Sequence, residues 1–151
     1  MTTISKELVI AQLEGLIENE ENWIANLSNA SALLNQTFDK INWVGFYLWE
    51  EDSNQLVLGP FQGKVACVRI DPGKGVCGTA FERKETIIVP DVNEFPGHIV
   101  CDAASQSEIV VPLIMDGKAI GVLDVDAPVK DRFSNDEKEL LETFVTVLLN
   151  N

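Results

Sequence analysis

Three cysteines, at positions 67, 77 and 101, are the first residues with chemical potential. A thiol reacts as the thiolate, so its surroundings decide whether it is active. Cys77 follows a tight turn at the predicted start of a short helix, where the helix dipole favours the thiolate. Cys67 lies in a predicted apolar strand, and Cys101 lies in a predicted loop beside Asp102, whose charge disfavours a thiolate. Electrostatics alone therefore indicates Cys77 as the most thiolate-like of the three.

The sequence argues against two common structural roles for the cysteines, a disulfide framework and a metal site. The N-terminal residues contain no long apolar block of the kind that directs export, so we expect a cytoplasmic protein with reduced thiols. An odd number of cysteines also argues against a disulfide framework. We expect no metal, because the chain has no CxxC pair and one histidine, His98. Two interpretations stay open: buried, inert thiols or redox chemistry.

Three acidic residues lie at the ends of a predicted β-hairpin. Residues two apart on a strand share a face, so Asp124 and Asp126 project together while Val125 faces the core. Antiparallel pairing brings Glu108, at the start of the preceding strand, alongside them. Carboxylates this close repel, and at least one of them should have a raised pKa. Such a cluster could donate a proton or hold an ammonium group; the alternative is a solvated strand end in an acidic protein.

Two aromatic residues complete the candidate site. Trp43 and Tyr47 share one face of a predicted strand and flank Gly45, which has no side chain. The resulting slot could accept a methyl or thioether group, with a sulfur–aromatic contact of about 1 kcal/mol. Ordinary core packing is the alternative. A nucleophilic thiol, a second thiol, a proton donor and an apolar cage are together what a thiol needs to reduce a sulfoxide. The ammonium of a free amino acid would need the carboxylates.

The elements that position these residues follow from hydrophobic periodicity. The pattern predicts two helices within the first 35 residues, a short helix over 76–83 and a final helix over 135–149 that a capping box opens. Strands are predicted over residues 41–49, 55–58, 65–70, 86–89, 109–115 and 119–125. An Asp-Gly pair at 116–117 is typical of a hairpin turn. Residues 90–107 are expected to form a long loop over the site.

This order predicts a single α+β domain over residues 1–151. We expect a mostly antiparallel central sheet of about six strands, with the N- and C-terminal helices packed on one face. A ligand pocket under the long loop would occupy the other face. The net charge of −13 disfavours nucleic acid and anionic membranes as partners. No apolar run approaches the roughly 20 residues of a transmembrane helix.

Four segments carry a family resemblance. The chain resembles the free methionine-(R)-sulfoxide reductases, which are stand-alone GAF-domain enzymes, at residues 42–47 (NWVGFY), 59–63 (GPFQG), 75–78 (GVCG) and 121–126 (GVLDVD). The resemblance covers nearly the whole chain, and the three cysteines keep the family's spacing. It implies a GAF-like fold and thiol-dependent reduction of free L-methionine-(R)-sulfoxide, through a sulfenic acid and an intramolecular disulfide, as antioxidant repair.

The resemblance also implies roles for single residues. It makes Cys101 the nucleophile, Cys67 the main resolving cysteine and Cys77 an accessory one, against the electrostatic ranking, and we follow the family. It assigns substrate binding to the acidic and aromatic positions, with the acidic ones also assisting at the sulfoxide oxygen: Glu108, Asp124, Asp126, Trp43 and Tyr47. No cofactor is implied. Thioredoxin is the implied reductant, and a homodimer the implied assembly.

Two other functions stay open. A non-catalytic GAF module would bind a small ligand such as a cyclic nucleotide, but we expect no output domain here, and an acidic pocket suits phosphate poorly. A thiol redox sensor would use the cysteines, yet it gives no role to the carboxylates or the aromatic residues.

Overall fold

The computed structural model describes residues 5–98 and 103–150. They form one central β-sheet with helices on both of its faces. Its strands have the order β3-β2-β1-β6-β5-β4, and each neighbouring pair is antiparallel. They are β1 (Trp43–Glu50), β2 (Gln55–Gly63), β3 (Arg69–Ile70), β4 (Ile87–Val89), β5 (Ser107–Met115) and β6 (Lys118–Ala127). The predicted six-stranded α+β architecture is confirmed.

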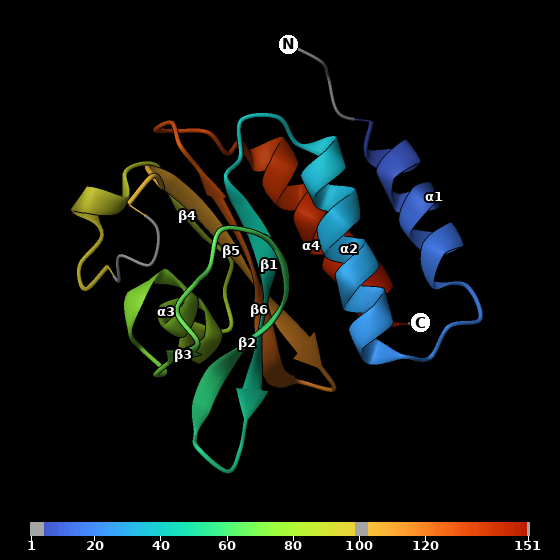
Figure 1. Cartoon of the computed structure of the whole chain (residues 1–151), viewed down its shortest axis with the longest axis horizontal. Coiled ribbons are helices and arrows are strands. Elements are labelled where there is room, and N and C mark those ends of the chain that lie inside the picture. Colours follow the sequence, from blue (N-terminus) through green and yellow to red (C-terminus); the bar gives the residue numbers. More distant parts are fainter. Residues whose placement is uncertain (1–4, 99–102, 151) are drawn as a thin grey trace.

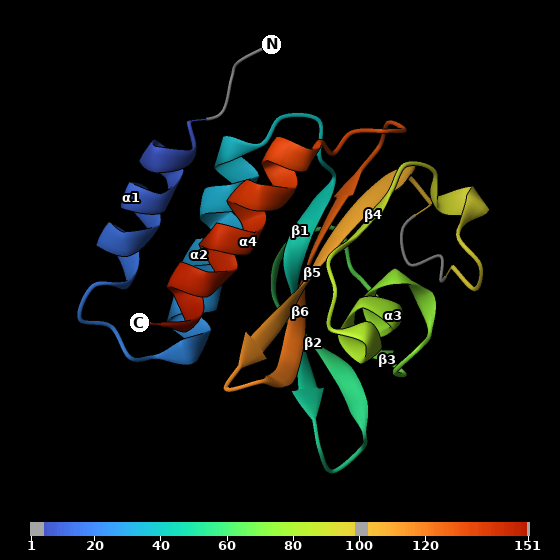
Figure 2. The same ribbon diagram turned by 180° about the vertical axis from the view of Figure 1, so that it is seen from behind.

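Helices cover both faces of the sheet unequally. Three of them, α1 (Lys6–Ile17), α2 (Trp23–Thr37) and α4 (Asn135–Leu149), lie together on one face, as Figures 1 and 2 show. The short helix α3 (Gly75–Arg83) lies on the opposite face. A turn of 3-10 helix, η1 (Val92–Glu94), follows β4 on the α3 side. The predicted capping box of α4 is present, with Ser134 and Glu137 each bonded to the other's backbone.

Strand alternation separates two apolar clusters. Toward the three helices, the strands bury side chains such as Phe46, Ile109 and Leu123, which are fully shielded from solvent. Each buried side chain of this size stabilises the fold by about 1.5–3 kcal/mol. A smaller cluster between the sheet and α3 includes Val76 and Val110. The larger cluster therefore provides most of the apolar core, and the opposite face of the sheet can carry a functional site.

The segment before β3 differs from the prediction. Residues 65–68 are not part of a strand; β3 consists of Arg69–Ile70, whereas β2 runs on to Gly63. At Gly63 the backbone turns through φ 144°, and Val65 beyond it is 88% exposed. Val65 and Ala66 line the pocket instead of forming a strand, and the segment is tied to β2 by the hydrogen bond from Leu58 N–H to the Val68 carbonyl at 2.9 Å. The predicted 116–117 turn is confirmed, with φ values of 54° and 78° at Asp116 and Gly117.

Among residues 5–98 and 103–150, no helix combines the length and apolar character that crossing a membrane requires.

Candidate active site

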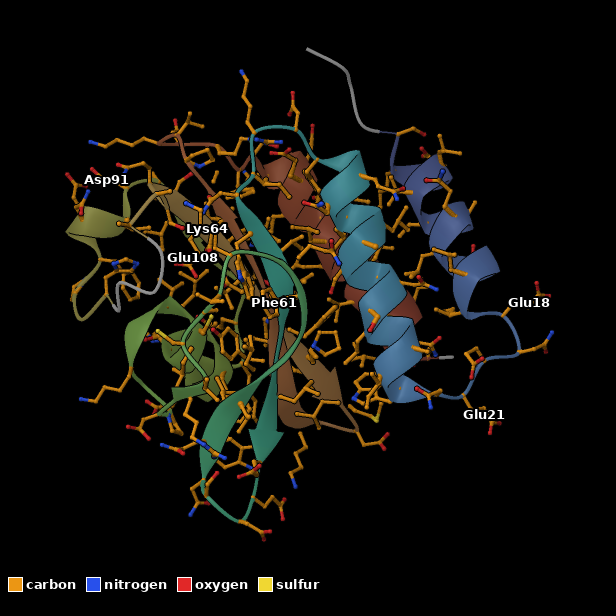
Figure 3. All side chains as sticks on the ribbon, viewed as in Figure 1. Glu18, Glu21, Phe61, Lys64, Asp91 and Glu108 are labelled. Atoms are coloured by element: carbon orange, nitrogen blue, oxygen red, sulfur yellow. The ribbon has the colours of Figure 1, made fainter. Side chains whose placement is uncertain are left out.

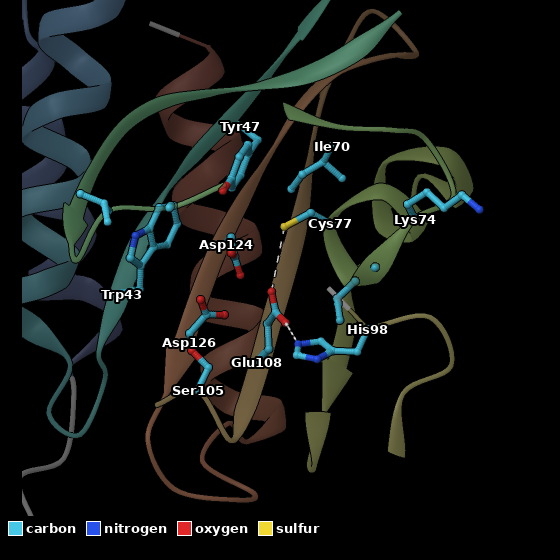
Figure 4. A pocket seen from close by; sticks show the side chains of 14 residues that line it. Trp43, Tyr47, Ile70, Lys74, Cys77, His98, Ser105, Glu108, Asp124 and Asp126 are labelled. Atoms are coloured by element: carbon cyan, nitrogen blue, oxygen red, sulfur yellow. Dashed lines mark hydrogen bonds and ion pairs between the residues drawn. The ribbon is translucent and has the colours of Figure 1, made fainter. Parts of the chain in front are cut away.

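A pocket opens on the face of the sheet that carries α3 (Figure 4). The space between its walls, open mouth included, is about 560 Å³. Side chains of β1, β5 and β6 form its floor, and the start of α3 and two loops form its sides. Figure 4 shows three acidic side chains at the centre, aromatic rings on one side, and Cys77 and His98 on the other.

The acidic residues converge as strand pairing predicts. Glu108 of β5 pairs with Asp126 of β6, and Asp124 follows two residues earlier on the same face. All three are buried, at 7%, 9% and 5% exposure respectively. One oxygen of Asp124, Oδ1, is buried and has no hydrogen-bond partner in the part of the chain that the structure describes. The predicted geometry is confirmed, while the chemical role of these residues stays a prediction.

Asp124, the most buried residue of the acidic cluster, has a raised pKa. Burial raises the pKa of Asp124 well above its ordinary value, and the nearby charges of Asp126 and Glu108 raise it further. A carboxyl group in this state keeps its proton to higher pH than an exposed aspartic acid does. Asp124 can therefore donate a proton within the pocket.

Two aromatic rings, Trp43 and Tyr47, line the facing wall, and a third, Phe61, stacks on Trp43 outside the pocket lining. Trp43 stacks on Tyr47 with ring centroids 5.9 Å apart, and on Phe61 with centroids 5.1 Å apart. The predicted open slot at Gly45 is wrong, because Phe61 of β2 occupies it. A Cβ at Gly45 would lie 2.2 Å from Phe61 Cβ. Because Gly45 has no side chain, β2 can pack closely against it. The apolar wall of the pocket is formed by the stacked rings of Trp43 and Tyr47.

The same rings hold the loop that carries Cys67. Trp43 Nε1 donates a hydrogen bond to the carbonyl of Lys64 at 3.1 Å, and Tyr47 Oη donates one to the carbonyl of Cys67 at 2.8 Å. Figure 3 shows Lys64 and Glu108 on the α3 side of the sheet. Cys67 is half-buried and disulfide-bonded. Its position therefore depends on side chains of β1 and not on the strand that the sequence predicted.

Cys77 is buried at the start of α3. Its thiol is free and lies 4.0 Å from Glu108 Oε2. Burial raises the pKa of the Cys77 thiol well above its ordinary value, and the charges of Asp124, Glu108 and Asp126 raise it further. The expected lowering of the Cys77 pKa by the helix dipole is wrong, because burial and three carboxylates outweigh one short helix dipole; the ranking of the three cysteines stays a prediction. Cys101, the predicted nucleophile, lies outside the described residues.

Two further features of the pocket were not predicted as site residues. His98 extends from the long loop, and its Nε2 lies 4.0 Å from Glu108 Oε1. The N-terminus of α3 has no side-chain cap, and Lys74 at that end points its side chain away from the pocket in Figure 4. The first N–H groups of a helix have no partner within it, so they suit an anion. A lone histidine in a loop and a Gly-Lys-Gly turn were weak signals in the sequence.

The arrangement suits a small zwitterion with an apolar tail. Carboxylates can hold a cationic group, peptide N–H groups a carboxylate, and the stacked rings a methyl or thioether group. The proton-retaining Asp124 adds a donor beside them.

Comparisons with known proteins agree with this geometry. The GAF domain model matches residues 24–149. The chain is 49% identical to the free methionine-R-sulfoxide reductase of Saccharomyces cerevisiae, over 97% of this chain and 87% of that protein. The reduced form of fRMsr from Staphylococcus aureus is 56% identical, with a TM-score of 0.93 over 99% of this chain and 98% of that one. The structure of the Neisseria meningitidis free methionine-R-sulfoxide reductase with its substrate is 43% identical, with a TM-score of 0.93 over 96% and 86% of the two chains.

Proposed function

The chain belongs to the free methionine-R-sulfoxide reductases, a family built on the GAF domain, and we propose that it reduces free L-methionine-(R)-sulfoxide to L-methionine. The observation that carries the proposal is the pocket in which a buried acidic cluster faces an aromatic wall. The loop of the disulfide-bonded Cys67 is tied to that wall through Tyr47. We extend the proposal to the whole chain as one GAF domain.

The pocket supports one orientation of the substrate. Its S-methyl group would contact the rings of Trp43 and Tyr47, and its ammonium would pair with Glu108 and Asp126. The substrate carboxylate would accept hydrogen bonds from the uncapped start of α3. A peptide-bound methionine sulfoxide lacks both charges, because its amino and carboxyl groups are in amide bonds. The two charged ends of the pocket therefore favour the free amino acid.

The proposed reaction has two balanced steps. The Cys101 sulfur attacks the sulfoxide sulfur while protonated Asp124 stabilises the sulfoxide oxygen; the oxygen passes to Cys101, which becomes a sulfenic acid, and methionine leaves. The Cys67 thiol then attacks the sulfenic sulfur, forming a Cys67–Cys101 disulfide and releasing water. The disulfide-bonded state of Cys67 supports its place in this pair.

The disulfide formed in each turnover must be reduced before the next one. A dithiol protein such as thioredoxin would exchange with the disulfide and return both cysteines to thiols. Cys77, buried beside Glu108, would act as an accessory thiol when the first pair is not formed. We propose a cytoplasmic homodimer that serves antioxidant repair.

Turnover with separate epimers tests the proposal. Reduced protein is incubated with the R or the S epimer of free methionine sulfoxide and excess dithiothreitol, and methionine is quantified. We expect methionine from the R epimer only, none from Cys101→Ser, and at least a tenfold lower kcat/KM in Asp126→Ala. Asp52→Ala, an exposed turn residue, is the matched control and should keep wild-type turnover. Folded, reduced protein that yields no methionine from either epimer would overturn the proposal and favour a ligand-binding module.

A further inference from the structure

Three side chains of different types bring donor atoms together in the pocket. Cys77 Sγ and one carboxylate oxygen each from Glu108 and Asp124 all lie within 4.8 Å of one another, and the three residues are buried. Cys77 Sγ is 4.0 Å from Glu108 Oε2. The donors come from α3, β5 and β6, elements that the core holds in place. The cluster is thus a fixed set of one thiol and two carboxylates.

A second observation points to a ligand at this cluster. Asp124 is 5% exposed, and its Oδ1 has no hydrogen-bond partner within residues 5–98 and 103–150. A buried carboxylate oxygen without a donor costs free energy that a bound cation would recover. His98 is not part of this set of mutually close donors; its Nε2 lies 4.0 Å from Oε1, the other oxygen of Glu108.

From this donor set we propose that the reduced protein binds one Zn²⁺ ion at Cys77, Glu108 and Asp124, with a water molecule as the fourth ligand. Zinc prefers four ligands of these types, at about 2.3 Å to sulfur and about 2.1 Å to oxygen. Tetrahedral angles then place sulfur and oxygen about 3.6 Å apart and two oxygens about 3.4 Å apart. The 4.0 Å between Cys77 Sγ and Glu108 Oε2 requires a contraction of a few tenths of an ångström, and the other two pairs, each within 4.8 Å, require one of at most about 1.4 Å. Magnesium and calcium are poor fits, because both prefer oxygen donors.

Zinc binding would inhibit the enzyme rather than assist it. On coordination the Cys77 thiol loses its proton to solvent, and the metal offsets the repulsion among the carboxylates. The ion would occupy Glu108 and Asp124, two residues that the proposed function gives to the substrate. Zinc and the free amino acid would therefore compete for one pocket. The metal site itself does not depend on the proposed function, since its ligands and its test involve no turnover.

A metal titration tests the site directly. Fully reduced protein is titrated with ZnCl₂ against a chromogenic chelator, for wild type, Cys77→Ser and Asp124→Asn. We expect one Zn²⁺ per chain in the wild type and at least a tenfold weaker affinity in each variant. Excess Mg²⁺ should not displace the zinc, whereas L-methionine should weaken its apparent affinity. Cobalt(II) should give a thiolate charge-transfer band that Cys77→Ser lacks.

Cys67→Ser is the matched control, because it removes a thiol outside the cluster. It should bind Zn²⁺ as the wild type does. Loss of binding in Cys67→Ser together with retention in Cys77→Ser would overturn the proposal, as would equal affinities in wild type and Asp124→Asn. Circular dichroism establishes that each variant is folded. Zinc binding in protein without reductase turnover would contradict the proposed function alone, and turnover without zinc binding would contradict the metal site alone.

Discussion

Replacing Asp124 with asparagine is expected to stabilise the protein while removing most of its activity. The Asp124 and Glu108 carboxyl oxygens lie within 4.8 Å of each other, and both residues are buried. Two unit charges at that separation repel by about 3.5 kcal/mol at an effective dielectric constant of about 20. Asparagine keeps the shape and removes the charge. Because protonation already relieves part of this repulsion in the wild type, we expect a gain of about 1–3 kcal/mol at pH 7.

The pH dependence follows from the direction of the pKa shift. Burial, followed by the charges of Asp126 and Glu108, raises the pKa of Asp124 in the folded state above its value in the unfolded chain. Between the two values the folded state binds more protons, so stability falls as pH rises. Below the unfolded pKa, near 4, both states are protonated and the Asp124 contribution is fully present. The advantage of Asp124→Asn should therefore shrink as pH is lowered from 8 toward 4.

Thermal unfolding at pH 4, 7 and 8 measures this difference. An increase of 1–3 kcal/mol corresponds to a Tm about 2–12 °C higher for a chain of this size. Asp116→Asn is the matched control: it makes the same chemical change in an exposed hairpin turn and should alter stability by less than about 0.5 kcal/mol. Loss of the proton donor should lower kcat/KM about 100-fold. An Asp124→Asn protein no more stable than wild type at pH 7 and 8 would refute the reasoning.

Three further predictions concern the elements around the site. Tyr47→Phe removes the 2.8 Å hydrogen bond to the Cys67 carbonyl, so disulfide closure after one turnover should slow about fivefold, for about 1 kcal/mol; unchanged closure in a quenched mass-spectrometric time course would refute the positioning role. Gly45→Ala places a Cβ 2.2 Å from Phe61 Cβ and should cost about 1–3 kcal/mol in urea unfolding, and full stability would argue against the packing described. Ser134→Ala removes the α4 cap and should lower stability by about 1 kcal/mol with kcat unchanged; reduced kcat in folded protein would contradict this.

Local pattern sufficed to predict part of the site. Alternation along a strand placed Asp124 and Asp126 on one face, and the 116–117 turn predicted that the preceding strand lies beside them. Both relations depend on neighbours in sequence and on one hairpin, so they were predictable before any tertiary contact was known. The exact partner of Glu108 was not, because an irregularity between Leu113 and Ile114 shifts the register by one residue and brings Glu108 opposite Asp126 rather than Val125.

Other features depend on long-range packing that no local pattern encodes. The helix position of Cys77 was predicted correctly, but its raised pKa comes from burial and from carboxylates on β5 and β6. Gly45 was predicted to leave an open slot, but Phe61 from the neighbouring strand occupies that space. The loop of Cys67 was predicted as a strand because Val65 and Val68 favour strands, although both are exposed. The predictions failed where distant elements determine the surroundings of a residue.

The most direct test of the proposed reaction is a single turnover without added reductant. Fully reduced protein is mixed with free methionine-(R)-sulfoxide, quenched with a thiol-alkylating reagent and analysed for methionine and for disulfide-linked peptides. The proposal predicts about one methionine per chain, matched by a Cys67–Cys101 disulfide, and no methionine in Cys101→Ser. Wild-type methionine formation in Cys101→Ser, or methionine without any new disulfide in the wild type, would contradict it.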